Sequence, residues 1–189
     1  MDKDAYRLVL ATCNRSTLKG ARDYAILRLF WDNALRRGEL ASCNCSDLNV
    51  EAQTLTILGK GRGTQKEAVS LSESTVSALL AWLAMHHNVT PNAPLFTAVD
   101  HAQFGHRLTG SAFYNVVKDA AAKAGVSKRL SPHRCRHSSI TAALDATNGN
   151  VREVKKLSRH ARTDTLLLYD DNRLNAQQKV TDLLSGLMD

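Results

Sequence analysis

The segment from Thr17 to Leu35 is the feature that most limits how this chain can fold. Its apolar residues recur at the spacing of an α-helix, and around Ile26–Trp31 they cover more than one face of that helix. A helix that is apolar on several sides must be surrounded by other elements. We therefore expect residues 17–35 to form the central helix of a mostly helical core.

A small sheet interrupts this helical pattern. Leu48–Val50, Thr54–Leu58 and Ala68–Leu71 have the composition of short strands, and the glycine-rich loop Gly59–Gly63 separates the last two. Further helices are predicted over residues 4–13, 38–43, 73–87, 110–124, 132–146, 151–158, 163–169 and 176–188. The sequence thus predicts an α+β fold that is mostly α-helical, with a small antiparallel β-sheet.

Composition limits the class of protein. With 189 residues, of which 43% are apolar, the chain can bury a sizeable core, and the lack of repeats or linkers favours one domain. The formal net charge is +7 and the pI is about 9.4, which favours a polyanionic partner such as nucleic acid. No run of residues has the pattern of a membrane span or a signal peptide, so we expect a soluble, cytoplasmic protein.

The cysteines do not indicate a metal site. Cys43 and Cys45 are separated by one residue, whereas zinc ligands usually have two or more residues between them. His86 and His87 could complete a set of four ligands, but adjacent side chains usually point in different directions. Free thiols in a reducing compartment are the simpler interpretation.

Groups that can bind a phosphate gather between Leu130 and Asp170. Ser131 and Pro132 have the pattern of a helix start, with the serine as the cap and the proline in the first turn. His133 and Arg136 lie three residues apart, so they share one face of that helix near its N-terminus, where backbone N–H groups favour an anion. A solvated basic helix end is the alternative for any one of these residues, but it explains the combination less well.

Two other basic segments are ambiguous when taken alone. Arg36 and Arg37 follow the central helix, and Glu39 lies three residues after Arg36. Such arginines can simply complement the negative end of a helix dipole. The loop Gly59–Gly63 carries Lys60 but lacks the Gly-Lys-Ser/Thr ending of a nucleotide-binding loop.

Taken together, four short motifs resemble the catalytic domain of the tyrosine recombinase (phage integrase) family, in the same order and over nearly the whole chain. The motifs are Ala34-Leu35-Arg36-Arg37-Gly38-Glu39-Leu40, Gly59-Lys60-Gly61, His133-Arg134-Cys135-Arg136-His137, and the pair His160 and Tyr169. Each motif is short and weak alone, whereas four in order are specific. The resemblance implies a site-specific DNA recombinase or integrase that cleaves and rejoins DNA strands.

The resemblance also assigns roles to six residues. Tyr169 would be the nucleophile that forms a covalent 3′-phosphotyrosine, and the other members of the set would bind the phosphate or move protons. The implied catalytic residues are Arg36, Lys60, His133, Arg136, His160 and Tyr169. The two arginines would bind the phosphate oxygens, in the place that metal ions take in many phosphoryl-transfer sites. The resemblance implies no metal, nucleotide or other cofactor.

Its implications extend to domains and partners. Residues 1–189 would form a single integrase-type catalytic domain, with the family's usual N-terminal core-binding domain absent. Double-stranded DNA would be the partner, in a bacterial or phage-type protein associated with the nucleoid. The chain would associate with itself on DNA, as a dimer to tetramer, through the C-terminal helix, whose apolar face carries Val180, Leu183, Leu184 and Leu187.

Several positions depart from the family pattern or leave alternatives open. Ala34 and Arg159 replace residues that are usually glycine, and Cys135 stands where leucine is common. Lys66 is a second candidate for the catalytic lysine. Tyr6, Tyr24 and Tyr114 compete with Tyr169 but lie in apolar helical patterns, and Arg37 competes with Arg36 if the register is shifted by one. A type IB topoisomerase-like enzyme and a DNA-binding protein that does not cleave are the two alternative functions.

Overall fold

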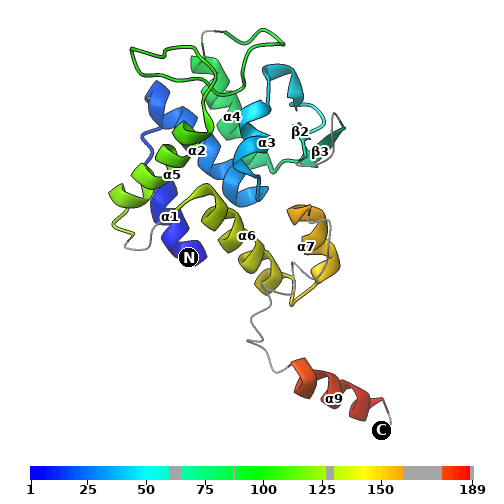
Figure 1. The fold of residues 1–189 in the computed structure, drawn as a ribbon. Helices are drawn as coiled ribbons and strands as arrows, with labels where there is room; N and C mark the ends of the chain where they lie inside the picture. The colour runs from blue at the N-terminus through cyan, green and yellow to red at the C-terminus, as the bar shows by residue number, and fades with distance from the viewer. Residues whose placement is uncertain (60–64, 87, 127–129, 160–175, 188–189) are drawn as a thin grey trace.

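A computed structural model describes residues 1–59, 65–86, 88–126, 130–159 and 176–187 of the chain. Helices predominate and a small sheet lies to one side of them (Figure 1). The α-helices are α1 (Lys3–Ala11), α2 (Leu18–Asp32), α3 (Arg37–Ser42), α4 (Glu73–Met85), α5 (Gly110–Lys123), α6 (Pro132–Ala146), α7 (Val151–Ser158) and α9 (Ala176–Gly186). The prediction of an α+β, mostly helical fold is therefore confirmed.

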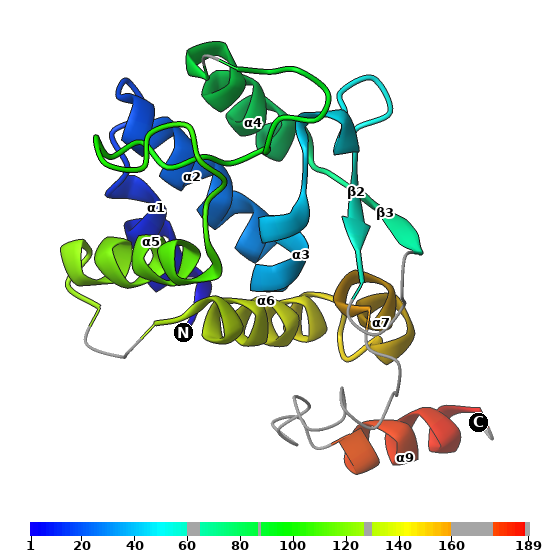
Figure 2. The ribbon, with the colours of Figure 1, turned by 45° about the horizontal axis from the view of Figure 1, so that its top comes forward.

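Helix α2 is the centre of the core, as its sequence predicts. It contacts α1, α4, α5 and α6 (Figure 2), and its residues Ile26, Leu27 and Phe30 are fully buried. The helix begins after Thr17, whose side chain accepts a hydrogen bond from the Gly20 N–H at 3.1 Å. These contacts explain why this segment is apolar on several faces.

The end of α2 differs from the prediction, which continued the helix to Leu35. The helix ends at Asp32, and Ala34 adopts a left-handed backbone conformation with φ of +46°. Ala34 and Leu35 are nevertheless fully buried. Burial therefore accounts for their apolar character, and the turn that follows the helix cannot be read from periodicity.

The sheet contains β1 (Leu48–Asn49), β2 (Thr54–Leu58) and β3 (Lys66–Ser70), paired antiparallel in that order. Its register places Leu55 opposite Val69 and Leu58 opposite Lys66. Strand β3 thus begins two residues before the predicted start at Ala68. The segment from 100 to 108, which the sequence leaves unassigned, contributes an isolated bridge between Thr97 and Arg107.

Helices α6 and α7 form as predicted. Ser131 caps α6 by accepting a hydrogen bond from the Arg134 N–H at 3.2 Å, and Pro132 is the first helical residue, so the predicted helix start is confirmed. Ile140 and Leu144 of α6 pack with Val154 of α7 in a second small core cluster. This packing sets the C-terminal end of α7 close to the turn at Ala34, which belongs to the same cluster.

Helix α9 lies away from the other helices in both views (Figures 1 and 2). Leu183 and Leu184 of this helix, and Leu187 directly after it, are 65%, 58% and 75% exposed. These three leucines of the predicted apolar face are therefore not buried against the described part of the chain. Among the helices of the described ranges, none combines the length and the apolar character needed to cross a membrane. The predicted helix over 163–169 lies outside the described residues.

Candidate active site

Arg36 lies at the start of α3, next to the buried carboxylate of Glu39. The Glu39 Oε2 accepts a hydrogen bond from the Arg36 backbone N–H at 2.8 Å, and Oε1 pairs with Arg36 Nη1 at 2.6 Å. The Arg36 side chain is 29% exposed, while that of Glu39 is 2% exposed. Glu39 therefore holds both the backbone and the guanidinium group of an arginine that still reaches the surface.

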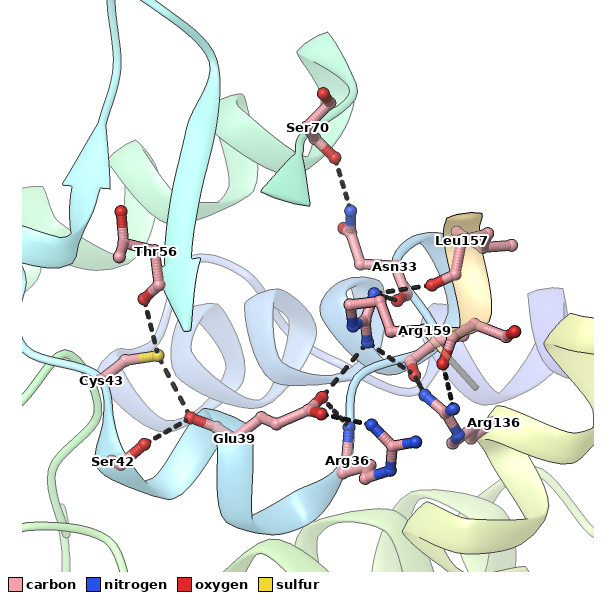
Figure 3. A network of polar contacts seen from close by, with 12 residues as sticks. Asn33, Arg36, Glu39, Ser42, Cys43, Thr56, Ser70, Arg136, Leu157 and Arg159 are labelled. Atoms are coloured by element: carbon pink, nitrogen blue, oxygen red, sulfur yellow. Dashed lines mark hydrogen bonds and ion pairs between the residues drawn. The ribbon is translucent and has the colours of Figure 1, made fainter. Parts of the chain in front are cut away.

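Arg136, on helix α6, lies against the turn that connects α2 to α3. It is buried, and its two terminal nitrogens donate hydrogen bonds to the backbone carbonyls of Ala34 and Ser158 (Figure 3). These bonds connect α6 to the end of α7 and to the turn that precedes Arg36. The two arginines, 100 positions apart in the sequence, are thereby brought to one place.

Arg159 is a third arginine in this network. It ends α7 in a left-handed conformation with φ of +54°, and its side chain is only 5% exposed. Its Nη2 pairs with Glu39 Oε2 at 3.2 Å and donates to the Ala34 carbonyl at 3.3 Å. Figure 3 shows its guanidinium group between Glu39 and Asn33.

The two ion pairs determine the charge state of Glu39. Burial alone raises the pKa of this carboxyl group, but Arg159, followed by the backbone N–H and the guanidinium of Arg36, lowers it, and the net result is a pKa below the usual 4.5. Burial has the opposite effect on the cation: it lowers the pKa of the Arg159 guanidinium, and the charge of Glu39 and its hydrogen bond oppose that change. Glu39 is therefore ionised at neutral pH and supports two cations.

This arrangement predicts how stability depends on pH. Because the folded-state pKa of Glu39 is lowered, its contribution is fully present above about pH 4.5 and is lost as the pH falls through that folded pKa. We expect Glu39→Gln to lower the free energy of unfolding by about 3 kcal/mol at pH 7, because Arg159 loses its buried counter-charge. The difference from wild type should narrow at acidic pH.

Urea unfolding at pH 7 and near pH 3.5 measures this effect. Glu51→Gln is the matched control, because Glu51 lies exposed in the turn before β2 and its replacement should change stability by less than about 0.5 kcal/mol. If the difference in the free energy of unfolding between wild type and Glu39→Gln is the same at both pH values, the proposed ionisation of Glu39 is contradicted.

The structure describes three of the six predicted catalytic residues. It brings Arg36 and Arg136 together, and it places His133 exposed in the first turn of α6, one turn before Arg136. Lys60, His160 and Tyr169 lie outside the described residues. His160 directly follows Arg159 in the sequence.

Lys66, the second candidate for the catalytic lysine, is engaged elsewhere. Its ammonium group pairs with Asp47 Oδ1 at 2.6 Å, and the Asp47 side chain is 7% exposed. Hydrogen bonding and charge attraction from Asp47 raise the pKa of Lys66. The pair ties the start of β3 to the turn before β1, which is a structural role.

The three alternative tyrosines differ in how deeply they are buried in the fold. Tyr6 is buried, and its hydroxyl donates to the Leu27 carbonyl at 2.7 Å. Burial raises its pKa well above the usual value, which makes it a poor nucleophile. Tyr24 packs against the core, with Arg15 4.9 Å from the centre of its ring, and Tyr114 is half-buried on α5.

Sequence reasoning missed the roles of Glu39 and Arg159. Glu39 is three residues after Arg36, the spacing at which a carboxylate can accept from the backbone N–H that precedes a helix. Arg159 was visible only as a departure from an expected glycine. Ala34 and Arg159 both replace a residue that is usually glycine, and this shared departure is the sequence signal that could have linked them. In the structure both residues have a positive φ, the conformation that glycine adopts most easily.

Comparisons with known proteins agree with this fold. The model of the phage integrase family matches residues 1–175. A tyrosine recombinase from Synechococcus elongatus is 52% identical over 98% of this chain and 58% of its own length, and one from Synechocystis sp. is 49% identical over 91% of this chain and 55% of its own length. The chain thus spans somewhat more than half of these relatives.

Solved structures show the same fold. The crystal structure of XerA recombinase matches 97% of this chain and 62% of its own with a TM-score of 0.77, at 24% identity. The XerH site-specific recombinase, solved with palindromic difH substrate in a post-cleavage complex, matches 98% of this chain and 53% of its own with a TM-score of 0.75, at 21% identity.

Proposed function

Because the chain belongs to the phage integrase family, we propose that residues 1–189 form an integrase-type catalytic domain that cleaves and rejoins DNA strands at specific sites. The observation that carries this proposal is the convergence of Arg36 and Arg136 on the turn at Ala34. Two guanidinium groups close together suit the non-bridging oxygens of one phosphate, and the charge of +7 suits a polyanion. Double-stranded DNA is the partner that this chemistry fits.

The proposed reaction is transfer of a phosphoryl group to a tyrosine. The Tyr169 oxygen attacks the scissile phosphorus, the bond to the 5′ oxygen breaks, and a 3′-phosphotyrosine ester forms. Attack of a different 5′-hydroxyl on that ester reverses the step and joins a new pair of strands. Arg36 and Arg136 stabilise the negative charge that develops on the non-bridging oxygens, and His160 adds a hydrogen bond there.

Two groups manage the protons. His133 accepts the tyrosine proton, because imidazole is a common general base and this side chain is exposed one turn before Arg136. Lys60 donates a proton to the leaving 5′ oxygen. We assign this role to Lys60 and not to Lys66, because the Lys66 ammonium is held by Asp47 and serves the sheet.

Trapping the covalent intermediate tests the proposal. The full chain is incubated with nicked suicide duplexes tiled across the genomic neighbourhood of its gene, so that the released strand end diffuses away and the adduct accumulates. A protein–DNA adduct that survives denaturation is the expected result. DNA binding without any adduct would favour a non-cleaving protein, and relaxation of any supercoiled plasmid without strand exchange would favour a topoisomerase-like activity.

Self-association on DNA is part of the same proposal. The leucines of α9 are exposed in the isolated chain, and an apolar helix face of this kind can fit a groove on another protomer. We propose that α9 packs on a neighbouring copy and links the active sites of an assembled complex.

Deleting residues 176–189 should therefore leave a folded monomer that still binds DNA but assembles less cooperatively and cleaves differently. The melting temperature should change by less than about 4 °C, because the described leucines of α9 contribute little burial. Thermal melting and analytical ultracentrifugation on DNA measure both effects. Leu8→Ser, which removes an exposed leucine from α1, is the control and should assemble normally.

The deletion has two contradicting outcomes. A truncated protein that unfolds or aggregates would place the helix in the chain's own core. Unchanged assembly together with unchanged cleavage would show that the helix is dispensable and would overturn the proposed coupling between protomers.

A further inference from the structure

Arg159 occupies a backbone position where glycine would be easier to accommodate. Its φ of +54° lies in the left-handed region, which is strained for residues with a side chain and free of strain for glycine. A helix that ends in this conformation usually has glycine there. A buried arginine at the site therefore calls for an explanation in terms of what its side chain contacts.

The Arg159 side chain joins the end of α7 to residues that lie 120 to 126 positions earlier in the chain. Its Nη1 donates to the carbonyls of Leu157 at 2.6 Å and Asn33 at 3.2 Å, while its Nη2 contacts Ala34 and Glu39. The guanidinium group thus spans the end of α7, the turn after α2 and the carboxylate in α3 (Figure 3).

Two of these contacts, those with Ala34 and Glu39, involve a group that also holds a proposed catalytic arginine. The Ala34 carbonyl accepts from both Arg159 and Arg136. The Glu39 carboxylate pairs with both Arg159 and Arg36. A change at Arg159 therefore alters the partners of both arginines, although its own side chain is too buried to touch DNA.

We infer that Arg159 is a positioning residue, which fixes Arg36 through Glu39 and Arg136 through the Ala34 carbonyl. This inference rests on the proposed function, since it concerns the same phosphate site. Backbone conformation alone favours glycine here, because glycine adopts a positive φ without strain.

The test measures single-turnover adduct formation on a suicide duplex that the wild-type chain cleaves. We expect Arg159→Gly to slow the reaction about 10- to 100-fold, the size of effect that misplaced catalytic groups produce, with DNA affinity within about threefold. Arg159→Lys should recover part of the rate, because an ammonium can pair with Glu39 but cannot bridge the carbonyls. Arg152→Ala, an exposed arginine on the same helix, should react within about twofold of wild type.

A double-mutant cycle separates positioning from general weakening of the fold. In an Arg36→Lys background, Arg159→Gly should slow the reaction by a smaller factor than in the wild-type chain, because one of the two arginines that it positions is already impaired. Equal slowing in both backgrounds, or Arg159→Gly at the wild-type rate, would overturn the inference while the proposed function stands.

Two further outcomes are also decisive. If Arg159→Gly melts below the assay temperature, Arg159→Lys replaces it in the double-mutant cycle, because lysine keeps the buried positive charge. Rate losses of Arg159→Lys and Arg36→Lys that simply multiply in the double mutant would overturn the inference. If the wild-type chain forms no adduct on any duplex, the proposed function fails, and the positioning role falls with it.

Discussion

Tyr169→Phe should abolish covalent attachment to DNA, with a rate loss on the order of 10⁴-fold or more, because the attacking oxygen is removed. DNA affinity should remain within about twofold of wild type, since a single hydroxyl is lost from a large, charge-dominated interface. Denaturing gels of suicide-substrate reactions measure the adduct, and gel shifts measure the affinity. The nine-residue spacing from His160 motivates this assignment.

The other tyrosines are the controls for this experiment. Tyr24→Phe and Tyr114→Phe should form adduct at nearly the wild-type rate. Tyr6→Phe should form it too, with a stability loss of about 1 kcal/mol from the missing bond to the Leu27 carbonyl. Peptide mapping of a trapped adduct to any tyrosine other than Tyr169 would show that the assignment is wrong.

Arg36→Lys and Arg136→Lys should each slow cleavage about 100- to 1,000-fold, or roughly 3–4 kcal/mol of transition-state stabilisation. A lysine ammonium cannot donate two parallel hydrogen bonds to a phosphate. For Arg136 there is an added reason, because lysine cannot bond to the Ala34 and Ser158 carbonyls at the same time. Single-turnover kinetics at saturating protein separates this loss from weaker binding.

Arg37→Lys is the matched control for the register of this motif. Arg37 is exposed, whereas Arg36 is the residue that pairs with Glu39. The control should therefore cleave within a few-fold of wild type. Strong loss in Arg37→Lys with little loss in Arg36→Lys would shift the catalytic position by one residue.

The arrangement of elements could be predicted from sequence because it depends on local signals. The apolar faces of α2 and α5, the Ser131 cap and the change to strand composition after Asp47 each fix an element without reference to the rest of the chain. The predicted ends of the helices and strands were less accurate. Helix α2 stops at Asp32 because Ala34 turns into a left-handed conformation, although the apolar pattern continues past it.

The site was only partly predictable, for a different reason. Arg36 was assigned by resemblance, whereas His133 and Arg136 were first singled out by their spacing at a predicted helix start, and the resemblance then gave them their roles. The connection of Arg159 to Glu39 depends on tertiary packing of α7 against α6 and the Ala34 turn, and no local pattern encodes a contact over 120 positions. The assignments of Lys60, His160 and Tyr169 remain predictions for the experiments above.

The crowding of guanidinium groups around Glu39 has a consequence for attempts to make this protein more robust. Arg36 and Arg159 share one carboxylate, and Arg136 lies buried beside them, so like charges repel one another in the absence of DNA. Replacing Arg36 or Arg136 by a neutral residue would relieve part of that repulsion while removing a proposed phosphate ligand. Engineering for heat tolerance is therefore best directed away from this cluster, where gains in stability and losses in activity have the same cause.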